Sequence, residues 1–168
     1  MPERRRDGGA ERMKCRLLAA GTRLPEWVNT GFREYQKRLR APLVLELEEI
    51  PVATRRAGEN PERAVAREGR SMLAAISSKD YVVALEVQGT SMSTEKLSGW
   101  LDERLRDGKP LALLIGGPDG LAPECLERAD RSWSLSPLTL PHALVRVVVA
   151  EQIYRAMSLK AGHPYHRA

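Results

Sequence analysis

Two loops in the last third of the chain carry residue types that could do chemistry. The first, Gly116-Gly117-Pro118-Asp119-Gly120, follows a short apolar run, and the second, residues 134–141, has the sequence S-L-S-P-L-T-L-P. Glycine lets a main chain approach a ligand closely. Small hydroxyls and main-chain N–H and C=O groups suit a ligand with an adenine edge and a methionine-like chain. The two loops therefore predict a site that holds a small polar cofactor largely through the backbone.

Each loop also has an ordinary structural explanation. The first follows a buried strand, where α/β folds bind ligands, but it has neither a phosphate-loop Gly-Lys-Ser/Thr nor a G-x-G-x-x-G fingerprint. It could equally be a plain turn from a strand to a helix. The second loop could be an irregular strand followed by a proline turn. The residues alone leave a ligand site and plain turns both open.

The tail of the chain, His163-Pro164-Tyr165-His166-Arg167, is the third candidate. Such side chains can stack on a base, donate to a phosphate and move a proton, whereas a frayed terminus is the ordinary alternative. No metal site is expected, because the His and Cys residues lack the three or four ligands at reinforcing spacing that zinc requires. No G-x-S-x-G or C-x-x-C motif indicates a nucleophile or a redox pair.

The elements that must position these residues alternate along the chain. Short apolar runs predict strands over residues 15–20, 43–50, 81–87 and 111–115. Helical spacing predicts helices from Pro25, over about 62–77, from an N-cap at Ser93 to 106, and over 143–159. Strands that alternate with helices indicate an α/β fold, with a mostly parallel sheet and helices on both faces.

The helix over 143–159 is unusually apolar, since hydrophobic residues cover more than half of its circumference. Such a helix is buried on several sides, by its own sheet and, we expect, by a second subunit. Arg146, Glu151 and Arg155 interrupt this apolar surface. Arg146 could form a mere surface pair, or it could reach a phosphate from its place one turn after the second loop.

Bulk properties restrict the class of protein. The 168 residues favour one domain, which we place at 13–168, with residues 1–12 as a disordered extension. A net charge of +5 is compatible with a nucleic-acid partner without proving one. No apolar run reaches the roughly 20 residues that cross a bilayer, and no secretory signal is recognisable. The two cysteines are isolated, so we expect a cytoplasmic protein that does not act on membranes.

Several long motifs resemble the RlmH family, bacterial methyltransferases that act on ring nitrogen 3 of a pseudouridine in 23S rRNA of the large ribosomal subunit. They are M-K-x-x-L-L-A-A-G-T from Met13, P-E-W-V-N-T-G-F-R-E-Y from Pro25, L-L-I-G-G-P-D-G-L, the stretch from Ser132 through the apolar helix, and the closing H-P-Y-H-R. The resemblance implies a SPOUT fold with a C-terminal trefoil knot, S-adenosyl-L-methionine as cofactor, a homodimer, and 23S rRNA within the ribosome as partner.

The resemblance also implies residue roles. The family's cofactor contacts fall on Leu85, Gly116, Gly117, Leu135, Ser136, Pro137, Leu138, Thr139 and Leu140. Its tail motif falls on His163 and on Tyr165, His166 and Arg167, the last three expected to be catalytic near the target base. Residues 1–12 have no counterpart, and the basic loop near Arg55 and Arg56 is shifted in length. The rival hypothesis is a non-catalytic RNA-binding or ribosome-associated α/β module.

Overall fold

The computed structural model describes residues 12–52 and 57–166, apart from the side chain of His166. Its centre is a five-stranded sheet of β1 (Met13–Ala20), β2 (Leu43–Ile50), β3 (Tyr81–Ser91), β4 (Leu111–Ile115) and β5 (Arg131–Ser134). The strand order is β2-β1-β4-β3-β5 and every pairing is parallel. Residues 1–12, which the sequence predicts to be an extension, lie almost entirely outside the described residues.

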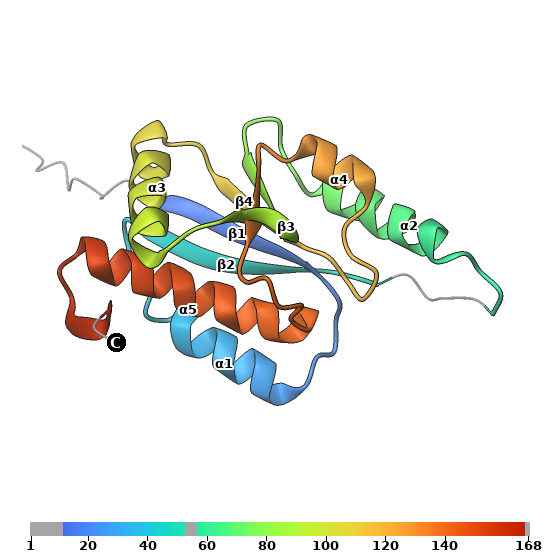
Figure 1. The fold of residues 1–168 in the computed structure, drawn as a ribbon, viewed down its shortest axis with the longest axis horizontal. Helices are drawn as coiled ribbons and strands as arrows, with labels where there is room; N and C mark the ends of the chain where they lie inside the picture. Colours follow the sequence, from blue (N-terminus) through green and yellow to red (C-terminus); the bar gives the residue numbers. More distant parts are fainter. Residues whose placement is uncertain (1–11, 53–56, 167–168) are drawn as a thin grey trace, which may run out of the picture.

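Helices cover both faces of the sheet (Figure 1), as the alternating pattern predicts. On one face α1 (Glu26–Gln36), α3 (Thr94–Asp107) and α5 (His142–Lys160) pack together, with α5 in contact with both of the others. On the other face lie α2 (Pro61–Ala74) and the short α4 (Pro123–Arg128). The chain then forms a 3-10 turn, η1 (Pro164–His166), which packs on α5.

Each face has its own hydrophobic core. Phe32, Trp100 and Ile153 join the sheet under α1, α3 and α5, whereas Met72 and Cys125 join it under α2 and α4. β4 contributes to both cores because its five residues are all buried. Complete burial of this strand explains why its sequence is continuously apolar instead of alternating.

The structure confirms the four predicted strands and the predicted cap, and it adds three elements, β5, α4 and η1. The Ser93 hydroxyl accepts a hydrogen bond from Lys96 N at 3.2 Å, which is N-cap geometry. The sequence did not predict β5 or α4. β5 has only four residues, R-S-W-S, and pairs with β3 alone at the edge of the sheet, so it shows little apolar periodicity.

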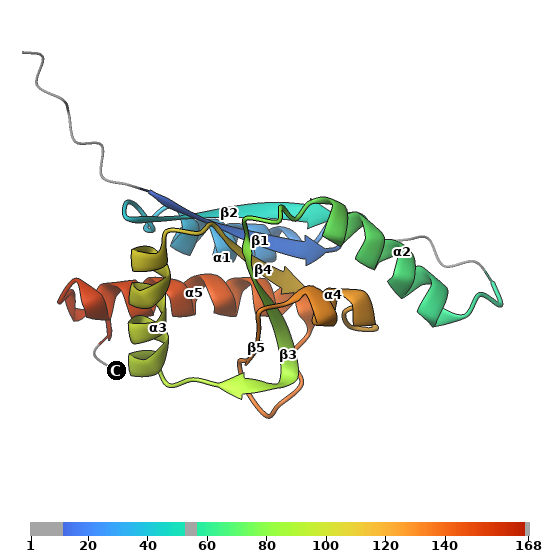
Figure 2. The same cartoon turned by 90° about the horizontal axis from the view of Figure 1, so that it is seen from above.

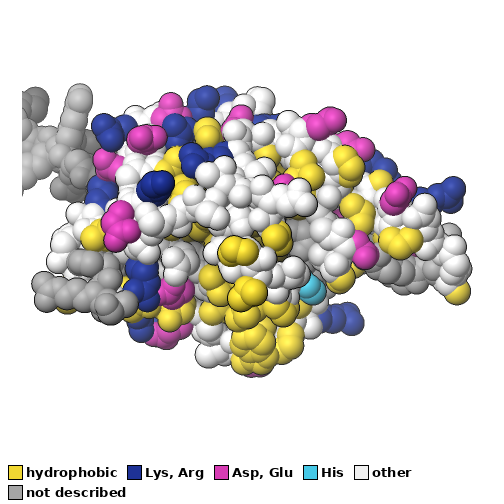
Figure 3. All heavy atoms as spheres, viewed as in Figure 1, with side chains coloured by type: hydrophobic (Ala, Val, Ile, Leu, Met, Phe, Trp, Pro, Cys, Tyr) yellow, Lys and Arg dark blue, Asp and Glu magenta, His cyan; other side chains and the backbone are white. Residues whose placement is uncertain are grey.

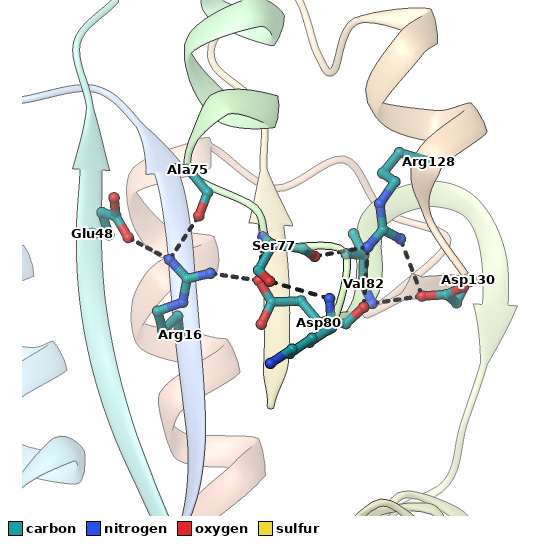
Figure 4. A network of polar contacts seen from close by, with 9 residues as sticks. Arg16, Glu48, Ala75, Ser77, Asp80, Val82, Arg128 and Asp130 are labelled. Atoms are coloured by element: carbon teal, nitrogen blue, oxygen red, sulfur yellow. Dashed lines mark hydrogen bonds and ion pairs between the residues drawn. The ribbon is translucent and has the colours of Figure 1, made fainter. Parts of the chain in front are cut away.

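A polar network ties β1 and β2 to the turn that leads into β3, near the amino ends of β3 and β4 (Figure 4). Arg16 in β1 donates to Glu48 in β2 at 2.9 Å, to the Ala75 carbonyl at 2.9 Å and to Asp80, just before β3, at 2.7 Å. Asp80 also accepts from Ser77 N. Arg128 continues the network by donating to the carbonyls of Ser77 and Asp80. Side chains thus join β1, β2 and the turn into β3, which are distant in the sequence.

We predict that Arg16→Met lowers the free energy of unfolding by about 3 kcal/mol, because it leaves the Asp80 carboxylate buried without its cation. The Asp80 side chain is only 4% exposed, and that of Arg16 is 19% exposed. Urea denaturation of the purified variant measures the change.

Lys14→Met is the matched control, since Lys14 also projects from β1 and pairs with β2 through Glu46 at 3.5 Å. That pair is 57% and 45% exposed, so its loss should cost less than about 1 kcal/mol. Equal costs for the two variants would contradict the proposed importance of the Arg16 network.

Candidate functional site

A cavity of about 770 Å³ opens at the carboxyl ends of β3, β4 and β5. Most of its wall comes from the end of β3, the turn after β4, the loop between β5 and α5, and the first turn of α5, and Trp133 of β5 and Leu126 of α4 complete it. Ligands of open α/β sheets bind outside the carboxyl ends of the strands, and this volume is within the range of small-molecule sites. The cavity is therefore the candidate site.

The glycine turn after β4 forms the floor of this cavity with its backbone. Gly120 N donates to Gly117 O at 3.0 Å, and Gly120 has a left-handed φ of +81°. A Cβ on Gly116 would lie 2.5 Å from the carbonyl carbon of Gly120, a distance that real structures do not tolerate. Glycine at 116 is therefore required for the turn to fold back on itself.

Gly117 has a different environment. A Cβ at this position would meet Glu68 at 3.5 Å and Ala20 at 3.6 Å, which are ordinary contact distances. Glu68 is a buried residue of α2. The residue at 117 thus packs toward α2 and does not depend on glycine for space.

The second loop brings most of its predicted residues to the same cavity. Its wall includes Leu135, Ser136, Leu138, Thr139 and Leu140, together with Leu85, Gly116 and Gly117 from the other segments. Two local hydrogen bonds shape this loop: Ser134 Oγ donates to Ser136 O at 3.1 Å, and Leu138 N donates to Ser136 Oγ at 3.0 Å. Pro137 is exposed and is not among the lining residues.

The end of β3 reaches the cavity through a bulge. Leu85 and Thr90 both pair with Trp133 of β5, so residues 86–89 lie outside the regular ladder. Figure 2 shows β3 turning sharply before its end. Gly89 permits this path, because a Cβ there would lie 2.8 Å from the main chain of Trp133. Glu86, Val87 and Gln88 consequently join the cavity wall beside Leu85.

Both sequence-based interpretations of Arg146, a surface pair and a phosphate ligand, are wrong, because its side chain is buried and already paired. It is 1% exposed. Its guanidinium donates to Glu49 at 2.9 Å and to the Gly21 carbonyl at 2.7 Å. It thereby fastens the first turns of α5 to the carboxyl ends of β1 and β2. Glu151 pairs instead with Arg155, four residues further along α5.

His142 is the first residue of α5 and lines the cavity next to the second loop. Burial lowers the pKa of His142, and the positive charge of Arg146 lowers it further. The imidazole is therefore neutral at physiological pH, and its free nitrogen can accept a hydrogen bond or a proton.

The tail lies apart from the cavity of its own chain. Tyr165 donates to Glu151 at 3.2 Å and stacks on Tyr154 with a centroid distance of 4.6 Å. From His142 to Glu151, α5 rises about 14 Å at 1.5 Å per residue. Tyr165 is thus not a lining residue. The side chain of His166 and all of Arg167 lie outside the described residues.

Other chemistries find little support in the described part of the chain. Within it, no three His, Cys, Asp or Glu side chains lie close enough to hold a metal ion. Both cysteines are buried, and burial raises the pKa of Cys15 to about 12, so that thiol is a poor nucleophile. Among the described helices, none is long and apolar enough to cross a membrane.

Sequence patterns missed Glu86, Gln88 and Trp133 as cavity residues. A usable signal was present, because a glycine inside a strand pattern often marks a bulge or a close backbone crossing. The strand predicted over residues 81–87 stops short of Gly89, so the continuation of β3 to Ser91 was not predicted.

We predict that Gly116→Ala destabilises the protein by about 1–3 kcal/mol, because the new methyl group forces the turn to move. Gly117→Ala serves as control and should change stability much less, since its Cβ fits at normal contact distance. Urea denaturation of both variants gives the comparison, and equal losses would show that the turn is not held at Gly116.

Comparisons with known proteins agree with this geometry. The family model described as "Predicted SPOUT methyltransferase" matches residues 13–166. A protein of Alkalilimnicola ehrlichii named "Ribosomal RNA large subunit methyltransferase H" is 56% identical over 93% of this chain and 100% of its own length. One of the same name from Pseudomonas aeruginosa is 51% identical over 92% of this chain and 100% of its own length.

A solved structure, the probable methyltransferase from Bordetella pertussis Tohama I, superposes with a TM-score of 0.56. It is 18% identical and covers 88% of this chain and 98% of its own, so it supports the fold alone. With the family model and the close relatives together, the chain belongs to the SPOUT methyltransferases and, among them, to the RlmH family.

Proposed function

We propose that the protein transfers a methyl group from S-adenosyl-L-methionine to ring nitrogen 3 of a pseudouridine in 23S rRNA of the large ribosomal subunit. The observation that carries this proposal is the convergence of two backbone-rich loops on one cavity. The names of relatives that are 51–56% identical over nearly the whole chain support ribosomal RNA as the substrate. A trefoil knot at the C-terminal end stays a prediction from family membership.

The cavity has the properties that this cofactor requires. The glycine turn presents main-chain groups where a side chain at 116 could not fit. Apolar side chains, among them Leu85, Leu135 and Leu140, can enclose an adenine ring, and the main chain of residues 135–140 can bond its edge. When bound, the cofactor supplies an electrophilic methyl group on a positively charged sulfur.

The chain's own groups must orient the base and remove its proton. Correct alignment of the reacting atoms can contribute about 7–11 kcal/mol to catalysis. The ring nitrogen loses a proton during the reaction, and the neutral imidazole of His142 at the cavity wall can accept it. Burial and hydrogen bonds to Tyr35 and Glu151 raise the pKa of Tyr165. That hydroxyl therefore stays protonated, and in this structure its single proton is donated to Glu151. It can donate to a carbonyl of the target base only after that bond is exchanged.

The position of Tyr165 supports a homodimer. Because Tyr165 packs on α5 away from the cavity of its own chain, we propose that it acts at the cavity of a partner subunit. Figure 3 shows hydrophobic side chains gathered over α1 and the adjoining part of α5. Trp27 on α1 is 57% exposed. An exposed apolar patch of this kind is typical of a protein interface.

We predict that the purified protein methylates large ribosomal subunits isolated from a strain that lacks this enzyme, with S-adenosyl-L-methionine as donor. Mass spectrometry of the digested 23S rRNA should show one methylated pseudouridine. A short RNA stem-loop should react poorly, because we expect the enzyme to recognise the shape of the ribosome as well as the target base.

A thermal shift series provides the control for cofactor identity. A ligand at 100 times its dissociation constant stabilises a protein by about 2.7 kcal/mol. We expect S-adenosyl-L-methionine to raise the melting temperature, and ATP and NAD to have no effect. Ribosome binding without any methyl transfer or cofactor shift would instead favour the non-catalytic module.

Mixing two inactive variants tests the shared site. Gly116→Ala removes the cofactor turn and Tyr165→Ala removes the tail hydroxyl, so each homodimer should methylate ribosomes poorly. In a mixed dimer, the Tyr165→Ala subunit supplies an intact glycine turn and the Gly116→Ala subunit supplies an intact tail. One complete site is thus restored, and activity should reappear after subunit exchange. Absence of recovery, with mixed dimers verified by native mass spectrometry, would show that turn and tail do not act together across subunits.

A further inference from the structure

Glu86 occupies an unusual position at the end of β3. It is the first residue of the bulge between Leu85 and Thr90, where the ladder to β5 is interrupted. Bulges redirect side chains and are frequent next to active sites. The bulge makes Glu86 part of the cavity wall, between Leu85 and Val87.

Glu86 is the one carboxylate among the described residues that line the cavity. The other ionisable lining group is His142, which is neutral at physiological pH for the reasons given above. The nearest buried cation, Arg146, is offset by Glu49. The formal charge at the cavity wall is therefore negative and comes from a single side chain.

Glu86 has no structural partner that would account for its charge. In the part of the chain that the structure describes, no hydrogen bond or ion pair to its carboxylate is present, although the residue is only partly exposed. By contrast, Glu49 at the carboxyl end of β2 is held by Arg146. A partly buried charge without a protein partner costs stability, which points to compensation by a ligand.

We propose that Glu86 makes the cavity selective for the charge of the methyl donor. This inference rests on the proposed function. S-adenosyl-L-methionine carries a sulfonium, an ammonium and a carboxylate, and so has a net positive charge. The product, S-adenosyl-L-homocysteine, has a neutral thioether and no net charge. A carboxylate at an apolar wall attracts the donor more strongly than the product, because the interaction is weakly screened there.

A preference for the charged donor over the neutral product would speed the exchange of product for donor after each methyl transfer. Donor and product share the adenosine and the amino-acid end, so main-chain contacts of the two loops hold both equally. An interaction that disappears with the transferred charge favours exchange of spent product for fresh donor. Glu86 is in this sense a specificity residue for the charge state of the cofactor.

The test compares the full-length protein with Glu86→Gln by titration calorimetry against both ligands. We expect the dissociation constant for S-adenosyl-L-methionine to rise about tenfold, equivalent to about 1.4 kcal/mol, with little change for S-adenosyl-L-homocysteine. Glu86→Asp keeps the charge and should retain most of the preference. Glu103→Gln, on the exposed surface of α3, makes the same change in net charge away from the cavity and should leave both constants unchanged.

Each other outcome has a definite meaning. If Glu86→Gln weakens both ligands by the same factor, the carboxylate binds a group that they share and the inference is wrong; unchanged constants also overturn it. Neither result touches the proposed function, because the wild-type protein still binds both ligands. If the wild-type protein binds neither, the proposed function itself fails. Thermal denaturation of the variants confirms that they remain folded.

Discussion

The arrangement of the site depends on the buried guanidinium of Arg146. This group joins α5 to the carboxyl ends of β1 and β2, through Glu49 and the Gly21 carbonyl. With the start of α5 fixed there, the loop that leaves β5 must pass across the ends of β3 and β4 to reach it. The cavity is the space enclosed by that path. Breaking the pair between Arg146 and Glu49 would leave a buried charge, which is strongly destabilising. The start of α5, and with it the course of the loop from β5, is therefore held in place.

The two ends of the sheet differ in what their polar groups contact. Near the amino ends of β3 and β4, Arg16, Asp80 and Arg128 are satisfied by neighbouring charges and carbonyls, and their network connects strands without leaving groups for a ligand. At the carboxyl ends, turns replace such connections, and main-chain groups and the Glu86 side chain face a cavity. Rigidity at one end thus supports an open site at the other, as is usual in α/β proteins whose ligands bind at the strand ends.

Sequence patterns predicted what local chemistry determines. Continuous apolar runs predicted four strands, and Ser93 predicted a cap, because these features depend on residues close together in the chain. The two loops were predicted as ligand candidates with plain turns as the alternative, and the structure shows that both loops line one cavity.

Features that arise between distant segments were not predictable. Arg146 pairs with Glu49, 97 residues away, and nothing in the local pattern distinguishes it from a surface arginine. The role of Glu86 depends on where β3 crosses Trp133 of β5, a strand too short to recognise. The tail resembled an active-site segment, and the structure places its Tyr165 against α5 instead of at the cavity of its own chain.

The glycine turn after β4 has a consequence for how such a site can change over time. A surface made of main-chain groups offers the same donors and acceptors whatever side chains accompany it. Residues of the second loop, such as the 73% exposed Leu138, can therefore be exchanged while the backbone keeps its hydrogen-bonding pattern. The course of the chain at Gly116 allows no such freedom, because any larger residue collides with Gly120. Natural selection should therefore constrain the side chains of the second loop less than it constrains the absence of a side chain at residue 116.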